Sequence, residues 1–225
     1  MTDDQTSGTP GDHVVRQGDF VSKIAAQRGF RDFRTIWEHA RNQGLKQQRT
    51  TPNVLLPGDS LFIPVKELRT EFRPTDARHR FVLSERGLRL RLIIKDMTDK
   101  PVAGKPCELK VTGSPDVTPL ATDGRGMVDR EIKPDAEQGK FVLKDAALPI
   151  DLDLELRIGH LDPIDSVTGA KARLNNLAYA GGEVNDERTL QFRSAVEEFQ
   201  CDHKLVVDGV YGPRTQAALK DAHGC

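Results

Sequence analysis

The sequence lacks the features typical of disulfide-rich, membrane-spanning and nucleic-acid-binding proteins. Its 225 residues include three cysteines, an odd number that does not suggest a disulfide framework. No apolar run approaches the roughly eighteen residues that predict a membrane span. The 33 Lys and Arg residues nearly balance 34 Asp and Glu residues, so the basic stripe of a dedicated nucleic-acid binder is not expected.

The first twelve residues also lack the features of a secretion signal. They are rich in Thr, Gly and Asp, with neither a basic leader nor an apolar stretch. Together with the cysteine count, this leads us to expect that the chain folds in the cytoplasm. Arginines gather between Arg69 and Arg91, where they alternate with apolar residues. We interpret them as the solvated face of strands, with a polyanion site as the alternative.

The hydrophobic period changes twice along the chain and predicts a multidomain α+β protein with domains at 13–65, 76–160 and 165–225. Residues 13–65 are typical of a strand, two helices and a strand. Asp19 and Asp32 are the expected N-caps of the two helices. Residues 41–52 are expected to form a polar connection. The last domain is expected to be helical, with helices over 172–179, from about Asp186, and from Pro213 at a first helical position.

Residues 76–160 switch to a period of two, which predicts an antiparallel β-sandwich of about seven short strands. The boundaries of this domain, near 66–74 and 161–168, combine prolines with charge and are expected to be exposed linkers. The candidate strands are 88–94, 107–111, 117–121, 127–132, 140–143 and 152–158.

Three segments near the N-terminus carry a family resemblance: 13–19 (HVVRQGD), 22–25 (SKIA) and 53–64 (NVLLPGDSLFIP). They resemble the lysin motif (LysM), a βααβ domain that binds N-acetylglucosamine-containing glycans such as peptidoglycan. The resemblance implies a shallow groove between two loops. Carried over by position, the glycan-binding residues are Gly18, Asp19, Phe20, Val21, Asn53, Val54, Leu55, Leu56, Pro57 and Gly58.

Two features depart from that family pattern. Phe20 replaces the usual Thr or Ser, and the 41–52 connection is longer than usual. Trp37 belongs to a helical apolar stripe, which favours a core or interface role over sugar stacking. We therefore name Phe20 and Trp37 as candidate partner-binding residues, with Phe20 as an exposed anchor. The alternative use of this domain is contact with proteins alone.

Three C-terminal segments carry a second resemblance: 173–179 (RLNNLAY), 195–200 (AVEEFQ) and 205–215 (LVVDGVYGPRT). They resemble the three-helix peptidoglycan-binding domain that accompanies many cell-wall hydrolases. Glycines 209 and 212 allow two tight turns, and Asp208 favours an Asx-turn. Glycan contact in this domain is expected from Asp208, Tyr211, Arg214 and Thr215. The middle segment resembles carboxypeptidase-regulatory-like and immunoglobulin-like spacers, and we expect no ligand site there.

No pattern of catalytic residues is present. Cys201, His203, His223 and Cys225 are conceivable zinc ligands, but their spacing is weakly specific and we expect solvent-exposed side chains. A nucleophile elbow, a phosphate loop and a His-Glu-x-x-His motif are all missing from the sequence. We expect no enzyme activity, no metal and no cofactor.

The combination of a LysM domain, a β spacer and a peptidoglycan-binding domain resembles accessory proteins of type VI secretion and related contractile injection systems. This implies a cargo, accessory or adaptor protein that meets peptidoglycan after export by such a machine. Spike, tip or baseplate proteins are then the expected partners. Two alternatives stay open: a structural baseplate or tail component whose end domains bind proteins, and the targeting subunit of a cell-wall hydrolase.

Overall fold

The structure is a computed structural model that describes residues 10–49, 51–67, 72–80, 88–96, 98, 100–114, 120–143 and 152–224. It contains helices and antiparallel sheets in three regions, each with its own hydrophobic core, and ends in a helical domain. This confirms the predicted multidomain α+β class. Within these residues no helix is long and apolar enough to cross a membrane.

The N-terminal unit, residues 10–65, has two strands with helices between them. Strand β1 (Gly11–Val14) pairs antiparallel with β2 (Ser60–Ile63). The chain between them forms α1 (Val21–Gln27), α2 (Arg34–Trp37), the 3₁₀ helix η1 (Ala40–Asn42) and α3 (Gln43–Gln48). The core of the unit consists of Val15, Val21, Ile24, Ala25, Ile36, Trp37, Leu55, Leu61 and Ile63.

Three local predictions for this unit were wrong. Helix α1 begins after Phe20 without a side-chain cap, because the Asp19 carboxylate instead accepts from the Arg16 N–H and lies against His13 and Lys23. The expected polar connection contains η1 and α3, which the hydrophobic period missed because Leu45 is the only large apolar residue of that stretch. Asp32 is not the N-cap of α2 either, because that position is Phe33, although Asp32 Oδ1 accepts from the Arg34 N–H at 3.0 Å.

The middle region is an antiparallel sandwich. One sheet pairs β3 (Leu88–Ile93) with β6 (Met127–Ile132), and the other has the order β5-β4-β7-β8. The strands of the second sheet are β4 (Pro106–Val111), β5 (Leu120–Ala121), β7 (Gln138–Leu143) and β8 (Leu152–Arg157). Leu109, Val128 and Phe141 lie in the core between the sheets. The described strands fall where the period of two placed them, while 117–119 of the candidate strand 117–121 lie outside the described residues.

The arginine-rich stretch is not uniformly a strand face, which corrects our interpretation. Arg89 and Arg91 do project from β3, where both bond to Asp129 of β6. Residues 72–80, however, form an exposed segment without strand structure. No strand pairs with this segment in the described structure.

The C-terminal helical domain packs three helices: α4 (Val167–Asn176), α5 (Leu190–Asp202) and α6 (Pro213–His223). Helix α4 begins earlier than predicted because the Ser166 hydroxyl caps it by accepting from the Gly169 N–H at 2.9 Å. Helix α5 begins later because Thr189 caps it in the same way, at 3.1 Å from the Phe192 nitrogen. The core consists of Ala170, Leu174, Phe192, Ala195, Val196, Phe199, Tyr211 and Leu219.

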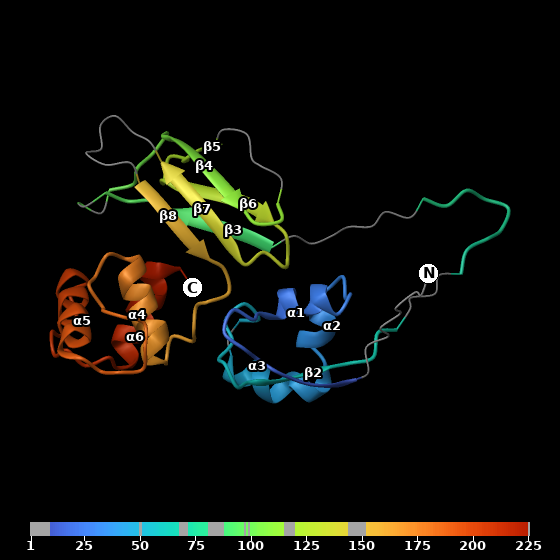
Figure 1. Cartoon of the computed structure of the whole chain (residues 1–225), viewed down its shortest axis with the longest axis horizontal. Coiled ribbons are helices and arrows are strands. Elements are labelled where there is room, and N and C mark those ends of the chain that lie inside the picture. Colours follow the sequence, from blue (N-terminus) through green and yellow to red (C-terminus); the bar gives the residue numbers. More distant parts are fainter. Residues whose placement is uncertain are drawn as a thin grey trace.

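The chain between β8 and α4 is not the exposed linker that we expected. Asp162 is buried, and its carbonyl oxygen accepts from the Arg173 guanidinium at 2.8 Å. The Ile164 carbonyl accepts from the Tyr211 hydroxyl at 2.7 Å. In Figure 1 this stretch runs from β8 past the N-terminal unit to α4, so all three folded regions are neighbours. Residues 72–80, in contrast, project away from them.

This difference predicts where a protease cuts first. Trypsin should cleave after Arg78 or Arg80, because 72–80 is exposed and without strand or helix, whereas the segment around 161–168 is packed. Mass spectrometry of an early time point identifies the cut. An R78Q/R80Q chain should resist early cleavage. A first cut after Lys171 would show that the packing of 161–168 opens more easily than the exposed segment.

Candidate functional site

Gln200, at the end of α5, organises the turn-rich loop 205–215 of the helical domain. Its side chain is buried, and its Oε1 accepts from the N–H groups of Asp208 and Gly209, both at 3.0 Å. Its Nε2 donates to Asp208 Oδ1, the Val210 carbonyl and Thr215 Oγ1 at 2.8, 3.2 and 3.0 Å. The side-chain amide of Gln200 therefore bonds to residues 208–210 within the loop and to Thr215 at its end.

Asp208 completes this loop from within. Its Oδ1 accepts from the Val210 N–H at 2.8 Å, which is the Asx-turn expected from the sequence. Hydrogen bonds from the Val210 N–H and then from Gln200 lower the pKa of Asp208, so the carboxylate is ionised at neutral pH. The Asp208 side chain is exposed, so it faces solvent while making these hydrogen bonds.

Two residues that we expected to contact glycan are inside the domain. Tyr211 is 7% exposed, packs edge-on to Phe192 and donates its hydroxyl to the Ile164 carbonyl. Thr215 is 4% exposed and bonds to Gln200. Neither side chain is accessible to a surface ligand. The expected tight turn is present at Gly209, whose φ is +68°, whereas Gly212 has an extended backbone and is the N-cap of α6, so the second predicted turn was wrong.

The surface of this loop is made by other side chains. Arg214 is exposed in the first turn of α6. Val206, Val207 and Val210 are exposed to 72%, 54% and 60%, an unusual concentration of apolar side chains on a short loop. Beside the ionised Asp208, the loop thus presents apolar surface next to charges of both signs.

In the N-terminal unit, Asp59 fixes the loop 53–58. Its carboxylate accepts from the Arg49 guanidinium at 2.8 and 2.9 Å and from the Leu56 N–H at 2.9 Å. Burial opposes ionisation, but the bonds from Arg49 and Leu56 outweigh it and lower the pKa of Asp59. Asn53, Pro57 and Gly58 are exposed, whereas Val54 and Leu55 are buried and cannot form an open apolar floor.

The other predicted loop, 18–21, lies against the rest of the chain. Gly18, Phe20 and Val21 are buried, and the Val21 N–H bonds to the Pro52 carbonyl at 3.0 Å, which joins the two predicted loops. Phe20 is 1% exposed and therefore is not the exposed anchor that we expected. Trp37 is 5% exposed and belongs to the core, which agrees with its apolar stripe but makes it, like Phe20, unavailable as the partner-binding residue that we expected.

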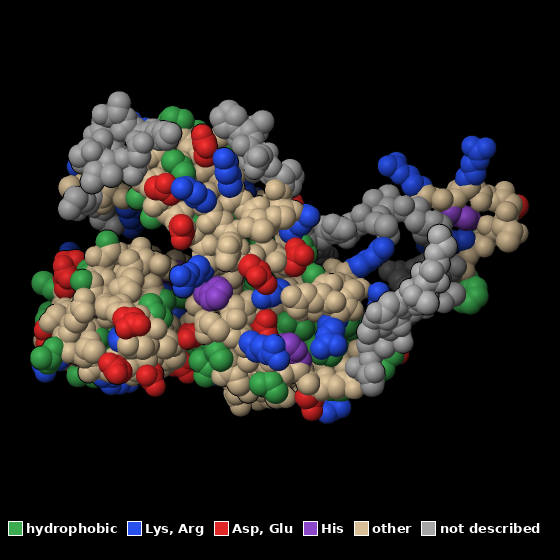
Figure 2. Space-filling model, in the orientation of Figure 1, with side chains coloured by type: hydrophobic (Ala, Val, Ile, Leu, Met, Phe, Trp, Pro, Cys, Tyr) green, Lys and Arg blue, Asp and Glu red, His purple; other side chains and the backbone are tan. Residues whose placement is uncertain are grey.

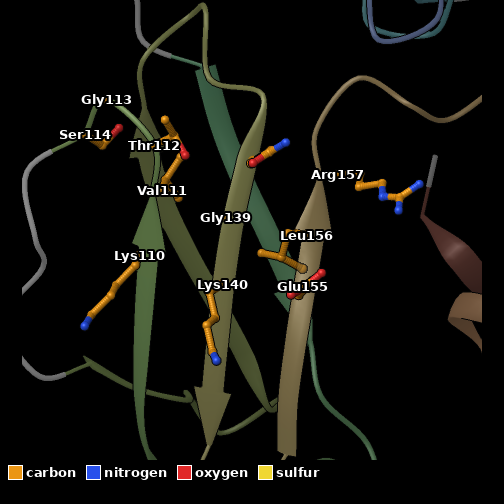
Figure 3. A pocket seen from close by; sticks show the side chains of 11 residues that line it. Lys110, Val111, Thr112, Gly113, Ser114, Gly139, Lys140, Glu155, Leu156 and Arg157 are labelled. Carbon is orange, nitrogen blue, oxygen red and sulfur yellow. The ribbon is translucent and has the colours of Figure 1, made fainter.

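The sandwich carries an open polar hollow of about 580 Å³ on the outer face of its four-stranded sheet. Lys110, Lys140 and Glu155 occupy paired positions across β4, β7 and β8. Figure 3 shows that the Lys110 and Arg157 side chains point to opposite sides. The hollow is thus a solvated, twisted sheet face, and its charged groups do not converge on one ligand.

The described cysteine and histidine residues of the helical domain do not form a metal-binding cluster. Cys201 is exposed, His203 stacks on Phe199 with ring centroids 4.1 Å apart, and His223 bonds to Asn176. No group of three or more potential metal ligands occurs in the described part of the chain, from which Cys225 is excluded. Charges of both signs alternate over the face of the molecule seen in Figure 2.

Sequence reasoning missed the two buried amides that shape the end units. Gln200 is the last residue of the segment 195–200 that carries the family resemblance. It follows the apolar stripe of α5, and that pattern did not predict a buried side chain at this position. Asn42, the counterpart in the N-terminal unit, donates to the carbonyls of Ile36 and Phe62 and accepts from the Phe62 N–H. A polar residue beside an apolar stripe is a weak signal of such a role, because the same pattern describes a helix boundary.

Comparison with known proteins assigns a family to the helical domain. Residues 164–219 match the family described as a peptidoglycan binding domain, which covers all of α4 and α5 and most of α6. The match confirms the resemblance of the C-terminal segments. No curated protein and no solved structure is significantly similar to the chain.

The Gln200 network predicts a large effect on stability. Gln200→Ala leaves the N–H groups of Asp208 and Gly209 without their acceptor, which should cost the helical domain about 2–4 kcal/mol. Urea unfolding followed by near-UV circular dichroism of the chain's two tyrosines, both in this domain, measures the loss. Gln216→Ala is the control, since that amide makes one long bond of 3.5 Å. Equal stability of the two variants would contradict the network's importance.

His223 predicts a pH dependence of the same domain. Burial, with a smaller contribution from the charged Arg173, lowers the pKa of His223 to about 4 from its ordinary value of 6.5. The unfolded chain therefore binds the proton more readily, so stability should fall as the pH drops from about 6.5 to about 4. His223→Gln should flatten this part of the profile, again read from the tyrosine signal. His203→Gln, at an exposed histidine, should leave the profile unchanged.

Proposed function

We propose that the chain is a non-catalytic peptidoglycan-binding protein whose helical domain carries the affinity through the surface of loop 205–215. The observation behind this proposal is the family match over 164–219, which ends within α6 and includes the whole loop. The buried amide of Gln200 makes the loop a preformed surface, so binding does not require the loop to be ordered first.

The exposed side chains suit the chemistry of peptidoglycan. This polymer carries acetamido and lactyl methyl groups on its sugars and free carboxylates on its peptides. The three exposed valines offer apolar contact for the methyl groups. Arg214, exposed in the first turn of α6, offers charge-assisted hydrogen bonds to a carboxylate.

We further propose that the N-terminal unit is a LysM-type domain and supplies a second, weaker glycan contact. The order of strand, helices and strand, and the antiparallel pairing of β1 with β2, support this assignment. Two weak sites on one chain raise the effective concentration at the second site once the first is bound. A polymeric ligand such as the cell wall can occupy both sites of one chain at once, so this effect strengthens its binding.

The proposed setting is a contractile injection machine, on which the protein is a cargo, accessory or adaptor. The combination of domain types supports this setting, and copurification with spike, tip or baseplate proteins tests it. A structural role in a baseplate is the second candidate. It is favoured by one observation: the loop 18–21 contacts protein in this structure, namely the chain's own residues 159–162.

Sedimentation with insoluble peptidoglycan tests the main proposal. The full chain should sediment with wall sacs and release no soluble fragments from them. Arg214→Ala should weaken binding about tenfold, as expected for a lost charge-assisted hydrogen bond. Arg188→Ala, at another exposed arginine of the domain, should bind like the unchanged chain. Failure of the chain to sediment, or equal binding by both variants, would contradict the assignment of the loop as the binding surface.

A further inference from the structure

The N-terminal unit contacts the chain between β8 and α4 through its loop 18–21. The backbone at Gly159 lies directly on the Phe20 ring: a Cβ built at 159 would come within 2.5 Å of Phe20 Cδ1 and 2.9 Å of the Gly18 carbonyl oxygen. Only a residue without a side chain allows this approach, and Gly159 also has a φ of +81° that favours glycine. The contact explains the burial of Phe20.

The neighbouring residue closes the other side of the loop. A Cβ built at Gly18 would lie 2.9 Å from His160 Nε2, so the imidazole covers the turn at position 18. Gln17 Nε2 donates to the His160 carbonyl at 3.3 Å and to Asp162 Oδ1 at 3.4 Å. These are long hydrogen bonds, so they orient the segment 159–162 more than they strengthen its attachment.

A lysine connects the same loop to the sandwich. Lys23 of α1 is 8% exposed, and its Nζ donates to the Gly18 carbonyl at 3.1 Å. The same Nζ lies 3.5 Å from Asp19 Oδ1 and 2.8 Å from Oε1 of Glu137, the residue just before β7. A lysine so buried needs paired charges, and one of its two carboxylates comes from the sandwich.

We propose that docking of loop 18–21 on residues 159–162 and glycan binding at that loop are mutually exclusive, so that the closed chain masks the glycan groove of its N-terminal unit. This inference rests on the proposed LysM-type function of that unit. Residues 159 and 160 cover Gly18 and Phe20 of loop 18–21, whereas Asn53, Pro57 and Gly58 of the other loop stay exposed. A glycan reaches Gly18 and Phe20 only when residues 159–162 leave them.

Competition of this kind lowers the apparent affinity by the fraction of chains that are open. A wedge at position 159 should therefore increase affinity without changing any residue of the N-terminal unit. Gly159→Ala places a methyl group against Phe20 and Gly18. Gly104→Ala is its matched control: that glycine also has a positive φ, of +66°, but a Cβ there meets nothing within 4 Å.

The test is a calorimetric titration of the full chain with an N-acetylglucosamine pentamer, together with small-angle X-ray scattering of each chain with and without saturating pentamer. The Gly159→Ala chain should have a larger radius of gyration than the unchanged chain and should bind the pentamer at least about fivefold more tightly. The Gly104→Ala chain should match the unchanged chain in both measurements. A Gly159→Ala/Glu137→Gln chain, which also loses the Lys23 pair, should open further if the single wedge is accommodated.

Saturating pentamer should also enlarge the unchanged chain, because the bound groove excludes residues 159–162. Binding without enlargement would overturn the proposal, as would equal affinity of an opened variant and the unchanged chain. Absence of pentamer binding to every chain would overturn it too. In that last case, sedimentation with wall sacs that still depends on Arg214 would show that the function proposed for the helical domain stands.

Discussion

Both end units contain a buried side-chain amide that bonds to the backbone of other parts of the unit. Gln200 satisfies groups at 208, 209 and 210, and Asn42 connects helix α2 to strand β2 through Ile36 and Phe62. Domains of this size bury a limited apolar area, so the geometry of a long loop cannot come from hydrophobic packing alone. In the described residues, no buried side-chain nitrogen or oxygen lacks a hydrogen-bond partner.

This constraint separates the motif residues into two roles. Tyr211 and Thr215 are buried and fix the loop from inside through their hydrogen bonds to the Ile164 carbonyl and to Gln200. The side chains left on the outside are Asp208, Arg214 and the valines. This second set forms the surface of the loop.

The three folded regions meet where β8 gives way to α4. Residues 159–162 contact the N-terminal unit, and the adjoining backbone at 162 and 164 accepts hydrogen bonds from the helical domain. A short stretch that belongs to no strand or helix thus fixes the orientation of both end units.

The sequence by itself determined the elements that follow a local rule. The period of two placed β6 at Met127–Ile132, and proline at the first helical position marked the start of α6. Asp208 formed its predicted turn because an Asx-turn needs only neighbouring backbone.

Only the tertiary structure decided which of these residues face solvent. Phe20 is buried because its ring lies against Gly159, far away in the sequence, where the absence of a side chain leaves room for it. Helix α3 has one large apolar residue, and Asp19 satisfies groups other than those of the helix it precedes. Burial and long-range hydrogen bonds depend on partners that folding brings together, and no local period contains that information.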